Sequence, residues 1–353
     1  AMGFKRSMER MHEIEKRLRD GMTKNGIGGA AQDQIVKSIT SFALYGFPES
    51  HAASFALIAY ASAYLKAHHA AAFYAALLNA WPMGFYHPAT LVKDAERHGV
   101  HVLPVDVNHS GWKCRWENGA VRLGLRFVKG LRQAAGEAIE AEQAKRPFES
   151  AADLMRRAAL RPSDMERLAH AGALRFEANA ARLTRRTALW QVAELARPAG
   201  ALFEELPLDA RSPLPEMSAV EETLADYETT SLTTGPHLVA HLRERLRAEG
   251  VLSTRELESR RDGDRVKAGG AVIVRQRPGT AKGFVFLSIE DETGVFQAIV
   301  RPDLFQENRA IIVGSPGLIV EGRVQRQDGT LSIKAEKLTH LAPLPEVPSH
   351  DFR

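Results

Sequence analysis

Five short runs of β-branched and aromatic residues follow one another between residues 269 and 341. Turn-forming pairs such as Pro278-Gly279 and Asp328-Gly329 separate most of them. The one longer connection, Pro302–Arg309, carries Leu304 and Phe305 on one side and predicts a short helix. This order is typical of a five-stranded OB-type barrel plugged by a helix between its third and fourth strands. The expected strands are Ala271–Arg277, Phe284–Glu290, Val295–Arg301, Leu318–Gln325 and Thr330–Leu338.

The second expected strand alternates two sets of side chains. Val285, Leu287 and Ile289 face one side and Phe284 and Phe286 the other, so one set can fill the barrel while the aromatic rings face a ligand. Aromatic rings beside basic side chains suit single-stranded nucleic acid, because bases stack on rings and phosphates attract cations. The alternative is that the phenylalanines are barrel core and the cations an ordinary solvated rim. The candidate single-strand or partner-binding face comprises Arg275, Arg277, Lys282, Phe284 and Phe286.

A second nucleic-acid signal precedes the barrel. Residues 128–131 lead into an expected helix at Arg132–Ala144, and helices at Ala151–Ala158 and Ser163–Ala171 are joined by a short turn. Two such turns predict a tandem helix-hairpin-helix domain, whose turn amides bind duplex phosphates without reading bases. The alternative for its basic residues is a set of solvated helix faces. The candidate duplex-binding residues are Lys129, Gly130, Arg132, Arg156, Arg157 and Arg161.

Composition limits the classes of function. The chain has 353 residues, of which 44% are hydrophobic and 25% charged, and this predicts a multidomain globular protein. The net charge of +4 permits a polyanionic partner. Cys114 is the only cysteine, so the chain can form neither an internal disulfide nor a thiolate zinc site, as expected in a reducing cytoplasm.

The N-terminal part is helical by its periodicity. The alanine-rich stretch 52–78 is interrupted by Lys66, His68 and His69, so we expect a buried helix rather than a membrane span. Ser50 is its expected N-cap, with His51 in the first turn. A helix N-terminus of this kind is either a simple cap or a phosphate site.

We therefore expect a multidomain α+β fold. The expected segments are a helical region (1–80), a small mixed segment plus the tandem helix-hairpin-helix domain (81–197), a proline-rich linker (198–218), a helical adaptor (219–262), the OB-fold (263–342) and a C-terminal tail (343–353).

The sequence contains none of the common catalytic signatures. It lacks a phosphate-cradling Gly-x-x-x-x-Gly-Lys loop, a His-Glu-x-x-His metal motif, a Gly-x-Ser-x-Gly elbow and a spaced pair of acidic residues for two-metal catalysis. We therefore predict no catalytic residue and no metal ligand in this chain. Its residues favour binding nucleic acid over transforming it.

Several longer motifs resemble a known family. Ala1–Arg6, Gly46–Tyr60 and Tyr64–His69 are similar to the fingers of C-family bacterial DNA polymerases, relatives of the polymerase III alpha subunit. Other runs resemble the error-prone, ImuC-type branch, which acts in translesion synthesis. These runs are Pro104–Asn108, Val121–Leu131, Val274–Gly283 and Ser349–Arg353.

The resemblance implies that the chain is the C-terminal region of a longer DNA polymerase. The palm, with its Mg²⁺-binding aspartates, would lie upstream, so no cofactor is expected here and the chain alone is expected to be inactive. Phe4 replaces a residue that is often basic in the replicative relatives, and Arg132 replaces the second glycine of the hairpin turn. Residues that would approach the incoming deoxynucleoside triphosphate are Lys5, Arg6, Ser50, His51 and Lys66.

The implied partners are primed-template and single-stranded DNA and the mutagenesis proteins ImuB and ImuA, without a membrane. The stretch 201–206 only faintly resembles a sliding-clamp peptide, because it lacks the glutamine, so clamp contact is expected to be indirect. Two alternatives stay open. One is a non-catalytic single-strand-binding repair protein, and the other is a protein-interaction fragment that docks ImuB through the adaptor and barrel.

Overall fold

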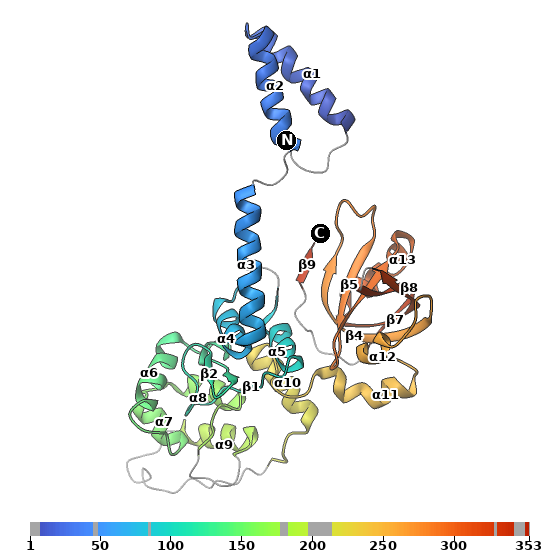
Figure 1. The fold of residues 1–353 in the computed structure, drawn as a ribbon. Helices are drawn as coiled ribbons and strands as arrows, with labels where there is room; N and C mark the ends of the chain where they lie inside the picture. Colours follow the sequence, from blue (N-terminus) through green and yellow to red (C-terminus); the bar gives the residue numbers. More distant parts are fainter. Residues whose placement is uncertain are drawn as a thin grey trace. The chain divides into compact units, whose positions relative to one another are not determined.

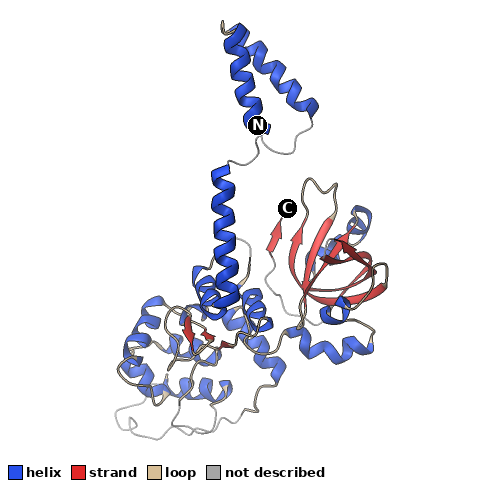
Figure 2. Cartoon of the chain, viewed as in Figure 1, coloured by secondary structure: helices blue, strands red, loops and turns tan. Residues whose placement is uncertain are grey.

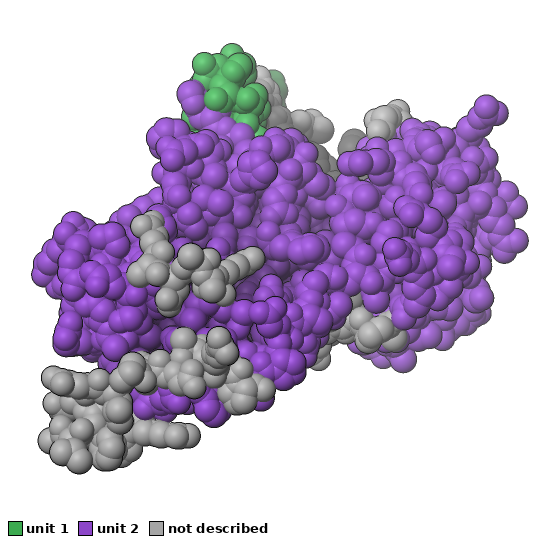
Figure 3. Space-filling view, turned by 90° about the horizontal axis from the view of Figure 1, so that it is seen from below, with its two compact units in different colours: residues 1–68 green, residues 69–353 purple. Residues whose placement is uncertain are grey.

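The computed structural model describes residues 8–44, 49–83, 86–176, 183–196, 214–327, 330–341 and 350–352. The chain divides into two units, Ala1–His68 and His69–Arg353, which Figure 3 shows in different colours. Among the described residues, helices form unit 1 and predominate in the first half of unit 2, while most strands lie in the C-terminal barrel (Figure 2). The predicted α+β class, with helical regions, a helix-hairpin-helix domain and an OB-type barrel, is confirmed.

The described residues of unit 1 form the helices α1 (Met8–Lys24), α2 (Gly29–Leu44) and α3 (Glu49–His68). The first two form a helical hairpin, in which Arg19 of α1 bonds Asp33 of α2 at 2.7 Å. Met22 and Val36 are buried apolar side chains of this hairpin.

The stretch 52–78 is not one buried helix. It divides between α3, which ends at His68, and α4, which begins at Ala70 in unit 2. The apolar side chains of α3 are exposed, with Phe55 at 57% and Tyr60 at 72% of their maximal area. The prediction of burial was wrong for α3, because an apolar helix needs a packing partner and its own sequence does not supply one.

Unit 2 begins with α4 (Ala70–Ala80) and α5 (Pro88–Arg97), which pack against a small sheet. The sheet has the order β1-β3-β2, with strands Val102–Leu103, Ala120–Arg122 and Arg115–Glu117 respectively. Tyr74 and Leu78 of α4 are buried in the same core as the later helices. The structure therefore places α4 in unit 2, whereas the sequence-based boundary at residue 80 had grouped it with α3.

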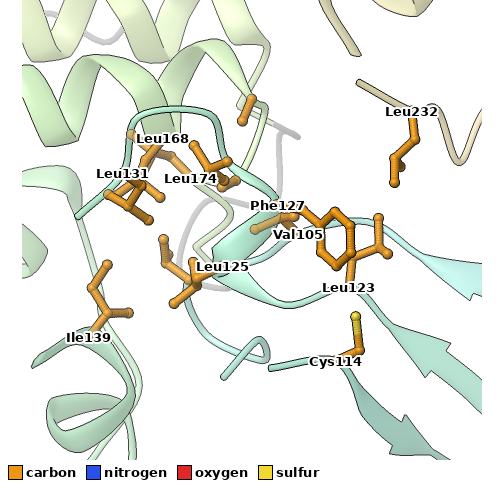
Figure 4. Close-up of a cluster of buried hydrophobic side chains, with 14 of the residues drawn as sticks. Val105, Cys114, Leu123, Leu125, Phe127, Leu131, Ile139, Leu168, Leu174 and Leu232 are labelled. Atoms are coloured by element: carbon orange, nitrogen blue, oxygen red, sulfur yellow. The ribbon is translucent and has the colours of Figure 1, made fainter. Parts of the chain in front are cut away.

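The helix-hairpin-helix region follows the small sheet. Its elements are η1 (Leu125–Phe127), α6 (Gln133–Gln143), α7 (Ala151–Arg157), α8 (Pro162–His170) and α9 (Arg185–Leu195). Side chains from η1, α6, α8 and the turns that follow η1 and α8 gather in one buried cluster, which includes Leu125, Leu131, Ile139, Leu168 and Leu174 (Figure 4). The two hairpins thus share a single core.

The adaptor connects this core to the barrel. It comprises α10 (Ala219–Thr230), η3 (Leu238–Leu242), α11 (Arg243–Ala248) and α12 (Thr254–Glu258). Ser218 and Ser253 begin α10 and α12 with capping boxes, in which Glu221 and Glu256 bond back to the cap backbone. The expected linker falls largely outside the described residues.

The barrel contains the five predicted strands, with the plugging helices between the third and fourth (Figure 1). Strand β4 pairs with both β5 and β7, and the pairs β5–β6, β6–β8 and β8–β7 close the ring. The short strand β9 (His350–Phe352) pairs in parallel with β4. The barrel elements are β4 (Arg265–Gln276), β5 (Val285–Glu290), β6 (Val295–Val300), α13 (Pro302–Glu307), α14 (Arg309–Gly314), β7 (Gly317–Gln327) and β8 (Thr330–His340).

Buried charges lie where α5, the adaptor and the barrel meet. Arg97 of α5 donates to Glu290 of β5 at 2.9 Å, and the Glu290 side chain is only 4% exposed. Lys93, one turn earlier, donates to the Gly235 carbonyl oxygen at 2.6 Å. On the adaptor side, Arg243 bonds Asp291 at 3.2 Å. The Arg97 and Arg243 contacts tie the barrel to α5 and to the adaptor.

Candidate nucleic-acid interface

The first hairpin turn runs from Val128 to Arg132. Gly130 has φ +74°, a conformation that glycine adopts without strain. The Leu131 amide donates to the Val128 carbonyl oxygen at 3.1 Å, and its side chain is buried against the core. Arg132 is the N-cap of α6, with no side chain capping the helix. The turn is therefore held by Leu131, while Gly130 and Arg132 lie at the surface.

Lys129 has a structural role in addition to its predicted one. Its amide donates to the Thr229 carbonyl oxygen at 2.8 Å, and its ammonium to the Tyr227 carbonyl oxygen at 2.9 Å. Both acceptors belong to α10, so Lys129 joins the first turn to the adaptor. The residue is still exposed.

The second turn repeats the plan of the first. Ala159 takes the left-handed conformation, with φ +49°, and Leu160 is buried. Arg161 is the N-cap of α8 in extended conformation, again without a side-chain cap, and is exposed. Sequence reasoning identified this turn without its left-handed residue, because an alanine rather than a glycine occupies it.

One cluster joins the two hairpins. Arg132 donates through Nη2 to Oδ2 of Asp164 at 2.5 Å, and this hydrogen bond raises the pKa of Arg132. Arg167 Nη1 lies 3.8 Å from the other oxygen, Oδ1. A Cβ on Gly130 would lie 2.9 Å from Arg167 Nε, so this guanidinium packs against the turn. Sequence reasoning missed Asp164 and Arg167, which come from a helix distant in sequence from the turn.

Two further predicted arginines differ in environment. The Arg156 side chain is 78% exposed, and its contact with Asp153 is long, at 3.5 Å. Its guanidinium is therefore available to a ligand. Arg157 is 11% exposed, stacks 4.5 Å from the Phe148 ring, and donates to the Glu142 and Arg146 carbonyl oxygens at 2.6 and 2.9 Å. Its donors are used within the fold, which favours a structural role over the predicted DNA contact.

We expect Arg157→Ala to lower the free energy of unfolding by about 2 kcal/mol, since it removes several hydrogen bonds worth about 1 kcal/mol each. Arg146 still bonds Asp153 at 2.9 Å, which limits the loss. DNA affinity per folded molecule is expected to be unchanged. Chemical denaturation and DNA titration of the same variant test this, and a DNA-binding defect without a stability loss would restore the original assignment.

The second barrel strand shows which of its side chains are core and which face outward. Val285, Leu287 and Ile289 are buried in the barrel core, whereas Phe284 and Phe286 are half-buried and outside it. In the strand register Phe286 lies opposite Ile299 and Gln276, and Ile299 lies opposite Lys334. The side chains Gln276, Phe286, Ile299 and Lys334 therefore form a row across the outer face.

The cations predicted for this face differ from one another. Arg275 donates to the Ile312 and Ser315 carbonyl oxygens at 2.7 and 2.5 Å, and so caps the end of α14. Its role is thus at least partly structural. Arg277 is exposed and lies 5.0 Å over the Phe305 ring, and Lys282 is exposed in the β4–β5 hairpin with φ +48°. Of the three predicted cations, Arg277 and Lys282 are therefore the ones exposed for contact with a ligand.

The candidate triphosphate residues are only partly described. Lys5 and Arg6 lie outside the described residues. Helix α3 begins at Glu49, one residue before the predicted cap Ser50. His51 is exposed, with its ring 4.5 Å from that of Phe55, and Lys66 is half-buried near the other end of α3.

Within the described residues, no group of three or more His, Cys, Asp or Glu side chains is arranged to hold a metal ion. None of the described helices combines the length and apolarity needed to cross a membrane. Cys114 is buried, and this burial raises the pKa of its thiol to about 11, which favours the neutral thiol at neutral pH.

Family models match both regions. A helix-hairpin-helix motif matches residues 99–186, and an OB-fold nucleic acid binding domain matches residues 265–341.

Curated relatives match nearly the whole chain. An error-prone DNA polymerase of Anaeromyxobacter dehalogenans is 44% identical over 100% of this chain and 32% of its own length. Another, from Pseudomonas savastanoi pv. phaseolicola, is 44% identical over 96% of this chain and 34% of its own length. The chain is a relative of the error-prone DNA polymerases. It spans about a third of the length of these relatives.

Among solved structures, asparaginyl-tRNA synthetase from Pyrococcus horikoshii is 28% identical, with a TM-score of 0.22. That match covers 28% of this chain and 26% of the synthetase chain.

Proposed function

We propose that this chain is the DNA-binding region of a longer, cytoplasmic error-prone DNA polymerase that acts in translesion synthesis and damage-induced mutagenesis. The observation that carries the proposal is a helix-hairpin-helix region and an OB barrel in one chain, with 44% identity to error-prone DNA polymerases over its full length. The two hairpin turns hold the primed duplex by its phosphates, and the barrel face holds the single-stranded template.

Nucleotide transfer belongs, in this proposal, to a part of the polymerase outside this chain. Two-metal phosphoryl transfer needs carboxylates that hold Mg²⁺, and no such cluster lies among the described residues. The exposed apolar side chains of α3 fit a helix that is covered in the longer enzyme, with Ser50, His51 and Lys66 near the incoming nucleotide.

We expect DNA binding to be independent of sequence and strongly dependent on salt. Each phosphate contact contributes about −0.9 to the slope of log K against log salt. Arg132→Ala should make this slope shallower, because Arg132 is 41% exposed at the first turn. Fluorescence anisotropy with a primed duplex at several salt concentrations measures the slope. Primer extension in the same mixtures should be absent, and extension by this chain alone would contradict the placement of catalysis elsewhere.

A protein partner is the second candidate for the barrel face. Its half-buried aromatic rings suit an ImuB- or ImuA-type mutagenesis protein as well as they suit bases. A pull-down with such a partner, with and without oligonucleotide competitor, separates the two uses. Contact with the sliding clamp is then indirect, through the partner.

A further inference from the structure

We propose that Asp164 is a positioning residue of the duplex interface, which holds the guanidinium groups of Arg132 and Arg167 beside the Gly130 turn so that both engage phosphate. The inference rests on the proposed DNA binding and adds to it one buried acid and one arginine that sequence reasoning missed.

The first observation is the burial of a carboxylate in a basic surface. The Asp164 side chain is 0% exposed, while its two arginine neighbours are 41% and 43% exposed. A buried carboxylate is costly unless it is paired and hydrogen-bonded, and Oδ1 of Asp164 lacks a hydrogen-bond partner within the described residues. Stability alone is therefore a weak reason for a carboxylate at this position, because an apolar side chain of similar volume often stabilises a fold equally well.

The second observation is the direction of the contacts. Arg132 stands at the start of α6, while Asp164 and Arg167 lie on α8, so the carboxylate links the two hairpins. Arg132 uses one of its five N–H donors on Oδ2, and Arg167 lies 3.8 Å from Oδ1 with its Nε packed over Gly130. Arg132 is hydrogen-bonded to the carboxylate, Arg167 lies within ion-pair distance of it, and both guanidinium groups stay partly exposed.

This arrangement suits a phosphodiester. A guanidinium fork matches two phosphate oxygens, and holding the fork in place reduces the side-chain entropy lost on binding. The left-handed glycine of the turn leaves room for the Arg167 guanidinium, because a side chain at Gly130 would collide with it. Asp164 thus neutralises part of the local positive charge, but it also fixes the orientation of the two arginine side chains.

The test depends on the sign of one effect. Asp164→Asn removes a negative charge next to two DNA-binding arginines, so electrostatics alone would tighten DNA binding. If Asp164 instead positions the two arginines, the same substitution should weaken DNA binding. We expect the Kd for a primed duplex to rise about tenfold at fixed salt, the order of one lost charge-assisted hydrogen bond, and the salt slope to become shallower.

Asp153 provides the matched control. Like Asp164, it is a buried acid in the first turn of its helix, and it bonds Arg146 and Arg157 at 2.9 and 3.1 Å. Asp153→Asn removes the same charge beside Arg146 and Arg157 and 3.5 Å from the exposed Arg156, so electrostatics alone should leave DNA binding per folded molecule unchanged or tighter. Thermal unfolding of both variants gives the folded fraction by which each Kd is corrected.

A second pair of variants keeps the inference testable if Asp164→Asn does not fold. Arg167→Lys preserves charge but loses the fork, and should weaken DNA binding several-fold, whereas Arg265→Lys, at an exposed arginine outside both hairpins, should not. Unchanged or tighter binding by Asp164→Asn, or by Arg167→Lys when the former is unfolded, overturns the positioning role. If the unmodified chain shows no salt-dependent DNA binding, the proposed function itself fails.

Discussion

Replacing Leu287 with alanine is expected to lower the free energy of unfolding of the barrel by about 2–5 kcal/mol, while replacing its neighbour Phe286 weakens single-strand binding by about 1–3 kcal/mol. Leu287 is fully buried in the barrel core, so its truncation leaves a cavity. Phe286 is half-buried on the opposite face of the same strand, where its ring can stack on a base.

Both variants are measured by chemical denaturation and by anisotropy with a short oligonucleotide. Ser288→Ala, two residues along on the same outer face, is the control without a ring. If Phe286→Ala costs as much stability as Leu287→Ala and leaves binding per folded molecule unchanged, the ring is structural. The outer face would then be left to a protein partner.

The second prediction concerns pH and two buried groups near the junction of adaptor and barrel. Burial raises the pKa of Glu290 to about 7, against the opposing effect of Arg97. Burial, with Lys93 nearby, lowers the pKa of His237 to about 3. Nδ1 of His237 accepts from the Val239 amide at 3.2 Å, as expected for a neutral ring.

Glu290 and His237 change the free energy of unfolding in opposite directions as the pH changes. The stability that Glu290 contributes is fully present below its unfolded pKa of 4.5 and is lost as the pH rises to about 7. The stability that His237 contributes is fully present above 6.5 and is lost as the pH falls towards 3. Between pH 4.5 and 6.5 each changes the free energy of unfolding by about 1.4 kcal/mol per pH unit, with opposite signs, so their sum is nearly flat.

Replacing either group alone should reveal the pH dependence of the unfolding free energy that the other group causes. Glu290→Gln leaves only the histidine, so acidification from pH 6.5 to 4.5 should cost about 3 kcal/mol of unfolding free energy. His237→Asn keeps a cap acceptor and leaves only the carboxyl group, so the same acidification should add about 3 kcal/mol. Urea denaturation at four pH values measures this, and parallel pH profiles for the two variants would disprove the opposition.

The elements that could be predicted are those whose signals are local. Alternation in Val285–Glu290 and the turns around it predicted a barrel strand and its inner side chains, because strand period and turn chemistry depend on neighbouring residues alone. The first turn was found through Gly130, and the second through its place between two short helices. The motifs also indicated the polymerase family, to which relatives at 44% identity belong.

What only the tertiary structure decided is which charged side chains remain available. Arg156 and Arg157 are adjacent in sequence, yet one is exposed and the other is used by backbone carbonyl oxygens of neighbouring segments. Arg167 joins Gly130 and Arg132 only through the packing of α8 on the first turn. The sequence by itself determined the five barrel strands and the two hairpin turns, since these follow from local periodicity and turn chemistry. The pairing of distant charges depends on packing between segments far apart in the chain, for which a single sequence carries no local signal.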